Sequence, residues 1–237
     1  MRTVQAVAWK EIQIYFGGPT AYIVGLIFLG LTGFFFAQDL ESAFPEASLG
    51  SFFQWAPLLL ILMAPTLTMR LLAEEQKLGT IELLLTSPVR DWEVVVGKYL
   101  ASLVFLLATL SLTLYYTLLL AVFANPDPGP IYSGYLGLVL LAAVGLSVGM
   151  LTTTLTSNQI VAAVVAMGIL LALYFVGVAS GVAGGVGSTV INEIGLDGHF
   201  EDFAKGIIDT KHIVYFVSLT IFFLFLTVRA LESRRWR

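Results

Sequence analysis

Five stretches of this sequence contain no Asp, Glu, Lys or Arg, and each is long enough to cross a lipid bilayer as a helix. A spanning helix needs about 20 predominantly apolar residues, within a range of roughly 17–25. Uncharged runs of this length leave few polar side chains for the surface of a soluble domain. The chain is therefore expected to be an integral membrane protein. The stretches cover residues 12–38, 47–69, 99–126, 128–192 and 212–228.

The amino-acid composition supports this class. Hydrophobic residues make up 58% of the chain, charged residues 12%, and the mean hydropathy is +0.90, whereas soluble domains contain about 25% charged residues. The net charge of −4 gives no indication of nucleic-acid binding. The chain has no cysteine, which excludes disulfides, thiolate metal sites and cysteine nucleophiles.

The fourth uncharged stretch is too long for one helix, and its polar middle, TTTLTSNQ at 152–159, divides it in two. The first apolar run begins only near Thr20 and exceeds the roughly 7–15 residues of a signal-peptide core, so it is interpreted as a retained span. The predicted fold class is all-α, with one transmembrane domain over residues 1–237. The expected spans are 20–37, 52–70, 99–123, 132–154, 159–182 and 212–230.

The distribution of basic residues predicts the orientation. Ten of the twelve Lys and Arg residues lie in the N-terminal segment, the 70–98 connection and the C-terminal tail, and the others are Lys205 and Lys211. Because Lys and Arg favour cytoplasmic loops, both termini and the 71–98 segment are expected to be cytoplasmic. The 183–211 segment is then extracytoplasmic.

The N-terminal segment, 1–19, is predicted to be an amphipathic helix lying at the cytoplasmic surface of the membrane. Val4, Ala8, Ile12 and Tyr15 fall near one face, and GGP at 17–19 breaks the helix before the first span. The alternative is a cytoplasmic extension of the first span.

A short helix is also predicted at the extracytoplasmic mouth. Phe200, Phe203, Ile207 and Ile208 follow helical spacing within the 183–211 segment. An ordinary ordered loop is the alternative.

Two histidines, His199 and His212, lie in or next to this segment. They are interpreted as solvated or interfacial side chains, and a metal site with Asp202 or Asp209 is the less favoured reading.

The spans contain clusters of hydroxyl side chains. Such groups can line a polar path for a substrate, or they can bond back to carbonyls of their own helix, which is commoner. Gly145 and Gly149, four residues apart, predict a close contact with a neighbouring helix. The path candidates are Thr109, Thr113, Tyr116, Thr152 and Thr153.

The 71–98 segment holds eight of the charged residues of the chain. Gly79 offers a helix break, Ser87-Pro88 is a helix-start signal, and the pattern from Asp91 can run into the third span. A loop that only anchors two spans does not need this design, so a docking surface for a partner is the favoured interpretation. Gly97-Lys98 superficially resembles the end of a phosphate-binding loop, but Trp92 stands where that motif needs Gly.

The same segment resembles the region after the second span in type-2 ATP-binding-cassette (ABC) permeases. That family typically reads E-E, three residues, G-T, a hydrophobic residue, E-L-L-L, two further residues and Pro, with Gly-Lys before the third span. The matching residues are Glu74, Glu75, Gly79, Thr80, Glu82, Leu83, Leu84, Leu85, Pro88, Gly97 and Lys98.

The C-terminal part resembles the branch of that family with the gliding-motility-type and copper-site-maturation-type permeases. Together with the six spans, the resemblance covers nearly the whole chain. The residues that carry it are His199, Phe200, Phe203, Gly206, Asp209, Tyr215 and Arg229 through Trp236.

The resemblance implies a permease subunit of an ATP-driven exporter in the cell membrane of a prokaryote. Two such subunits, identical or related, would stand side by side above two copies of a cytoplasmic ABC ATPase. The ATPase would bind ATP and Mg²⁺, so this chain would hold no cofactor and catalyse no reaction. Its coupling helix would lie near residues 79–88. The implied coupling residues are Glu74, Glu75, Gly79, Thr80, Ile81, Glu82, Leu84, Leu85, Pro88 and Arg90.

Two other function classes stay open. One is a membrane scaffold that transmits force to a motility or secretion complex without bulk transport. The other is a self-powered secondary transporter, which is disfavoured because the spans contain no centrally placed charged residue.

Overall fold

The computed structural model describes residues 2–40, 48–79, 89–179 and 193–234. Within these ranges the chain forms α-helices and no β-strand. Six of the helices are long and apolar enough to cross a membrane, which confirms the predicted fold class. The six are α2 (Pro19–Leu40), α3 (Gly50–Thr68), α6 (Asp91–Phe123), α7 (Pro128–Leu155), α8 (Gln159–Ala179) and α11 (Thr210–Arg234).

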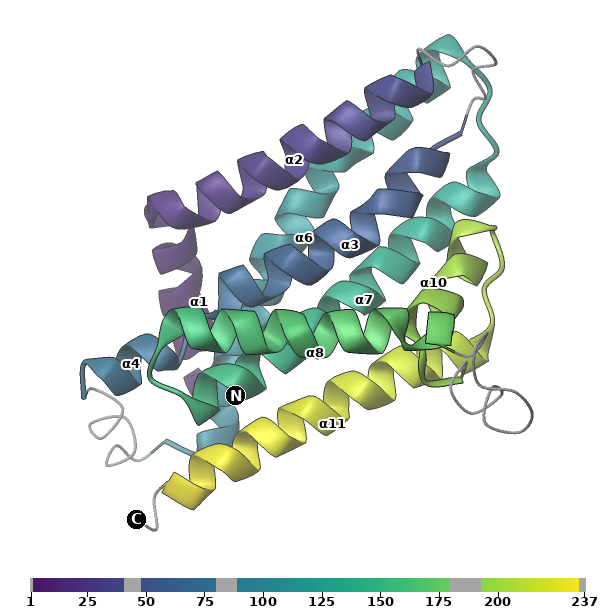
Figure 1. Cartoon of the computed structure of the whole chain (residues 1–237). Helices are drawn as coiled ribbons and strands as arrows, with labels where there is room; N and C mark the ends of the chain where they lie inside the picture. The colour runs from purple at the N-terminus through teal and green to yellow at the C-terminus, as the bar shows by residue number, and fades with distance from the viewer. Residues whose placement is uncertain (1, 41–47, 80–88, 180–192, 235–237) are drawn as a thin grey trace.

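Three shorter helices lie at the ends of this bundle (Figure 1). They are α1 (Arg2–Gly17), α4 (Ala73–Lys77) and α10 (Leu196–Ala204). Helices α1 and α4 lie at one end, together with the end of α11, and we call it the Lys98 end. Helix α10 lies at the opposite end, which we call the α10 end.

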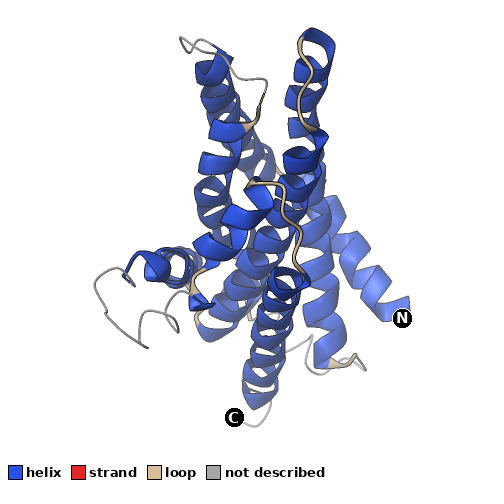
Figure 2. Ribbon diagram, turned by 90° about the vertical axis from the view of Figure 1, so that its right-hand side faces the viewer, coloured by secondary structure: helices blue, strands red, loops and turns tan. Residues whose placement is uncertain are grey.

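Helix α7 is the centre of the bundle and packs against α3, α6, α8, α10 and α11. Figure 2 shows the bundle from the side, with its helices joined by loops. Its glycines allow this crowding. A Cβ at position 149 would lie 2.0 Å from Thr68 Oγ1, and one at position 145 would lie 3.0 Å from the Ala64 Cβ. The close helix contact predicted for Gly145 and Gly149 is therefore confirmed, and its partner is α3.

Helix α1 ends at Gly17, and α2 begins at Pro19, so the predicted break is confirmed. Proline suits the first helical position because the N–H that it lacks would have no partner there. After the break α1 runs in a different direction from α2 (Figure 1) and packs on α6. Helix α1 is therefore not collinear with the first span, while its position on the membrane surface or as a cytoplasmic extension stays a prediction.

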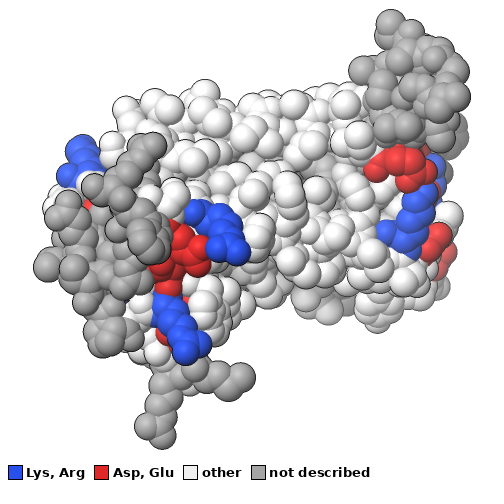
Figure 3. Space-filling view, turned by 90° about the horizontal axis from the view of Figure 1, so that it is seen from below, with Lys and Arg blue, Asp and Glu red and all other residues white. Residues whose placement is uncertain are grey.

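The charged side chains on the face seen in Figure 3 gather at its two ends and leave an uncharged belt between them. A protein in a bilayer needs this distribution, because the hydrocarbon region solvates charges poorly. Many apolar side chains of the spans are exposed on the isolated chain, including Leu26, Leu118 and Ile221. This surface suits lipid or neighbouring subunits.

The short helix predicted within the 183–211 segment is confirmed as α10, with Phe200 and Phe203 buried, while its extracytoplasmic position stays a prediction. The expectation for Ile207 and Ile208 is wrong, since the helix stops at Ala204 and both side chains are exposed. Gly206 takes φ = +94° after the helix, a conformation that reverses the chain and that other residues rarely adopt.

Candidate functional site

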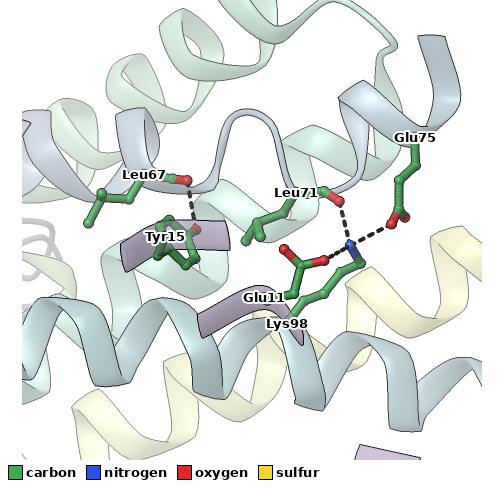
Figure 4. Close-up of polar contacts among 6 residues, drawn as sticks. All are labelled: Glu11, Tyr15, Leu67, Leu71, Glu75 and Lys98. Atoms are coloured by element: carbon green, nitrogen blue, oxygen red, sulfur yellow. Dashed lines mark hydrogen bonds and ion pairs between the residues drawn. The ribbon is translucent and has the colours of Figure 1, made fainter. Parts of the chain in front are cut away.

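The Lys98 side chain is the centre of a buried polar cluster at the Lys98 end. Its Nζ lies 2.6 Å from Glu11 Oε1, 2.8 Å from Glu75 Oε1 and 2.8 Å from the Leu71 carbonyl oxygen (Figure 4). An ammonium group has three N–H donors, so these three acceptors use all of them. We call Glu11, Leu71, Glu75 and Lys98 the Lys98 junction.

The junction joins three parts of the chain that are far apart in sequence. Glu11 lies on α1, Glu75 on α4 and Lys98 on α6. The Lys98 side chain is 2% exposed, that of Glu11 8% and that of Glu75 21%. A lysine with so little access to water is stable as a cation only with such partners, so the junction fixes the positions of all three helices.

Helix α6 reaches the junction because it begins at Asp91 instead of near residue 99, where the uncharged stretch starts. The Glu93 carboxylate accepts a hydrogen bond of 3.3 Å from the Arg90 backbone N–H and caps the helix start. The prediction that the pattern from Asp91 runs into the third span is therefore confirmed.

Gly97 lets α1 approach α6 closely beside the junction. A Cβ at this position would lie 2.9 Å from the Val7 side chain and 3.1 Å from the Val4 carbonyl oxygen. The Gly97-Lys98 pair thus has a structural explanation. Gly97 leaves room for α1 to pack closely, and Lys98 forms an ion pair with Glu11 of α1.

Tyr15 provides a second attachment of α1. Its hydroxyl donates a hydrogen bond of 2.8 Å to the Leu67 carbonyl oxygen, and the Arg70 guanidinium lies 5.6 Å from its ring centre (Figure 4 shows the hydrogen bond). Burial, reinforced by the nearby negative charge of Glu11, raises the pKa of Tyr15 far above its ordinary value. The hydroxyl therefore stays protonated and keeps donating this bond.

Helix α4 is fixed to α7 by Gln76. The Gln76 Nε2 donates to the Thr153 carbonyl oxygen at 2.8 Å and to that of Thr154 at 3.3 Å. Beyond α4, Gly79 takes φ = +70°, which confirms the helix break predicted there. The segment between α4 and α6 therefore follows a helix that is bonded to α7 and precedes a helix whose first turn is capped.

The predicted coupling residues fall into two groups in the structure. Glu74, Gly79 and Arg90 are exposed, whereas Glu75 contacts Lys98. The contact of these residues with an ATPase stays a prediction. The other predicted residues lie outside the described residues, and they are Thr80, Ile81, Glu82, Leu84, Leu85 and Pro88.

The hydroxyls predicted as path candidates bond to helix backbone. The Thr109 hydroxyl donates to the Phe105 carbonyl oxygen and that of Tyr116 to the Leu29 carbonyl oxygen. These bonds fit the alternative in which hydroxyls stabilise helices and their contacts, and a polar path through the residues stays a prediction. Thr113, Thr152 and Thr153 likewise bond to carbonyls three residues earlier.

The two histidines meet at the α10 end. The His212 Nε2 lies 2.8 Å from Asp202 Oδ2, and the ring centres of His199 and His212 are 4.8 Å apart. Both are buried, so the solvated alternative is wrong, while an interfacial position of the two side chains stays a prediction. Among the described residues, no group of three or more His, Cys, Asp or Glu side chains is arranged to hold a metal ion.

The ion pair between Glu11 and Lys98 is a feature that the sequence analysis missed. Two signals point to it in retrospect. Glu11 lies beside Ala8, Ile12 and Tyr15 on the apolar face of α1, and Lys98 directly precedes a long uncharged run. A charge at such a position needs a partner of opposite sign.

Comparison with known proteins gives a family for the chain. A family model described as "ABC-2 family transporter protein" matches residues 28–207. A comparison with curated proteins finds no match. The matched region runs from α2 into the turn after α10 and includes α4, the start of α6 and Lys98. Because the match covers most of the chain, this protein belongs to the ABC-2 family of transporter proteins and is a multi-pass membrane subunit of that type.

Proposed function

We propose that this chain is the permease subunit of an ATP-driven exporter and that it receives mechanical work from a separate ATPase at its Lys98 end. In this proposal two permease subunits, identical or related, stand in the cell membrane of a prokaryote with both termini in the cytoplasm. Two ATPase subunits bind ATP and Mg²⁺ below them, and their closure displaces the segment between α4 and α6.

The observation that carries the proposal is the anchoring on both sides of that segment. Before it, α4 is bonded to α6 through Glu75 and to α7 through Gln76. After it, the first turn of α6 is closed by Glu93. A displacement of a segment held in this way is passed to the spans, whereas a loosely attached loop would absorb it.

The distribution of charge supports the orientation. Most basic residues of the chain lie at the Lys98 end or in segments attached to it, which is the pattern of a cytoplasmic face. A cytoplasmic ATPase can reach the coupling segment only if this end faces the cytoplasm.

A second candidate function is force transmission without bulk transport. It is favoured by the path candidates Thr109, Thr152 and Thr153, whose hydroxyls bond to carbonyl oxygens of their own helices. Export through a single subunit is therefore disfavoured, and an export path between two subunits is the form of the main proposal that fits these bonds.

The proposal is tested by purifying the full chain in mild detergent with an affinity tag and identifying the proteins that remain bound. We expect an ATPase with a phosphate-binding loop, bound in equal numbers to the permease. Flux of radiolabelled compounds from vesicles that contain the complex then separates export from force transmission. An ATPase that turns over without moving any compound would favour the second candidate.

A further inference from the structure

A cavity lies at the α10 end, where residues of α3, α8 and α10 come together (Figure 1). Its volume is about 510 Å³, which falls within the roughly 300–1,000 Å³ of small-molecule sites. The Lys98 junction lies at the opposite end of the bundle. Coupling to an ATPase there does not require this cavity, so its lining calls for a separate explanation.

Five of the side chains that line the cavity are aromatic. Phe53 of α3, Tyr174 of α8 and Phe200 of α10 are buried and form its floor. Trp55 and Phe175 are 39% and 48% exposed and therefore lie at its edge. Because the faces of aromatic rings carry partial negative charge, such a lining attracts organic cations as well as apolar groups.

The α10 side of the cavity carries a negative charge. Asp197, Glu201 and Lys205 line it at intervals of four residues, which places them on one side of the helix. The Lys205 Nζ lies 2.5 Å from Glu201 Oε1, so these two charges compensate each other. Asp197 is instead hydrogen-bonded to the Tyr174 hydroxyl, which is uncharged. With two carboxylates and one ammonium group, the lining has a net charge of −1.

The arrangement of these groups favours a ligand that is both charged and apolar. Aromatic residues of the spans α3 and α8 supply an apolar surface, while the charges are on α10 at the end of the bundle. Glu201 and Lys205 are 61% and 57% exposed in their side chains, so a charge bound beside them stays close to water. A small metal ion fits less well, because it needs several oxygen ligands that converge on one point.

We propose that this cavity binds a hydrophobic organic cation. The positive charge of the ligand lies beside Asp197, and its apolar part packs on Trp55, Tyr174 and Phe200. The ligand is a soluble ammonium or phosphonium compound or the ammonium headgroup of a lipid, which share this chemistry. Binding depends on the cavity alone and is independent of the proposed ATPase.

The test is equilibrium binding of radiolabelled tetraphenylphosphonium to the full chain in dodecyl maltoside, a detergent without charge. Tetraphenylborate has the same shape and the opposite charge, and it is therefore the matched probe. We expect saturable binding of one phosphonium ion per chain and roughly tenfold or more weaker binding of the borate. Equal binding of the two ions, or no saturable binding of the phosphonium, would overturn the proposal.

Two substitutions should shift the affinity for the phosphonium in opposite directions. Asp197→Asn keeps an oxygen for the Tyr174 hydroxyl but removes the charge, and it should weaken binding roughly two- to fivefold. Lys205→Gln removes the competing cation and should tighten binding by a similar factor. Glu74→Gln, an exposed carboxylate at the Lys98 end, is the control and should change nothing. Damage to the fold would weaken binding in both variants, so shifts of the same sign would contradict the proposal.

Adding phosphatidylethanolamine to the detergent distinguishes the two sources of the ligand. Competition with the phosphonium would identify the ammonium headgroup of a membrane lipid as the ligand. Binding of the phosphonium that this lipid does not reduce would identify a soluble cation. Both results support the site. Failure to find a bound ATPase would contradict the proposed function and leave the binding results unchanged.

Discussion

Glu11 and Lys98 form an ion pair of 2.6 Å across 87 positions of sequence, with both side chains buried. This pair attaches the N-terminal helix to the start of the third span. Because Glu75 contacts the same ammonium group, Lys98 connects α1, α4 and α6 at the Lys98 end. Removing Lys98 should therefore affect all three helices.

Lys98→Met is expected to destabilise the protein strongly. It would leave the carboxylates of Glu11 and Glu75 close together without a cation, and breaking a buried ion pair in this way costs about 3–5 kcal/mol. The measurement is thermal unfolding of the purified chain in detergent, followed by the loss of a monodisperse size-exclusion peak. Lys77→Met is the matched control, because Lys77 is exposed and its loss should change Tm little. Equal Tm values for the two variants would contradict the structural role of Lys98.

Gly149→Ala is expected to weaken the packing of α3 on α7. The added methyl group would collide with Thr68, and overpacking of this kind costs about 1–3 kcal/mol. Gly168→Ala is the control, since no atom outside its own helix lies within 4 Å of its added Cβ. In the same thermal assay, Gly149→Ala should lower Tm and Gly168→Ala should not. Combining Gly149→Ala with Thr68→Ala should restore part of the loss.

The features that the sequence predicts well are those that depend on local chemistry. Uncharged runs predict the spans, since the bilayer imposes the same demand on each. Gly17, Gly18 and Pro19 predict the break before α2, because backbone geometry alone decides it. The spacing of Gly145 and Gly149 predicts a close helix contact. It does not predict that α3 is the partner, because nothing in the residues around the two glycines indicates which helix packs there.

The features that could not be predicted depend on which segments meet. Glu75 looks like a surface charge in the sequence, yet its carboxylate contacts Lys98, 23 positions later on α6. The sequence indicates a solvated or interfacial His199, yet its side chain is buried between α10 and α11 and contacts the ring of Tyr215. In both cases the pairing partner is distant in sequence, and only the packing of the bundle brings the two together.

Replacing Gly79 with a residue that disfavours positive φ should disturb the end of α4. Gly79→Ala forces a left-handed conformation that costs roughly 1–2 kcal/mol, so the chain after α4 should leave in another direction. Gly79→Asn is the control, because Asn adopts this conformation more readily. The measurement is the amount of ATPase that copurifies with each variant. We expect a clear loss for Ala and near-normal binding for Asn, and normal binding for both would contradict the requirement for positive φ.

The packing of α10 should depend on pH through His199. Burial, followed by the neighbouring His212, lowers the pKa of His199 below its ordinary value of 6.5, while Glu193 and Asp202 oppose the shift. An exposed histidine therefore binds a proton at a pH where the packed one does not. Stability of the packed state is complete above about pH 6.5 and falls as the pH drops below that value.

Hydrogen–deuterium exchange at residues 196–204 is the measurement for this prediction. Exchange, corrected for its intrinsic pH dependence, should be faster at pH 5 than at pH 8. His199→Phe keeps an aromatic ring but cannot bind a proton, so most of the difference should disappear. A difference of the same size in the variant would assign the effect to another group.

The most direct test of the central claim is the ATP hydrolysis rate of the partner ATPase with and without this chain in lipid nanodiscs. We expect the ATPase to bind the wild-type chain and to change its turnover severalfold on assembly. Glu82→Lys and Gly79→Pro should abolish this change while the permease still inserts and runs as a single species. An ATPase that binds and turns over identically with the wild-type chain, with either variant and with no permease would contradict the claim.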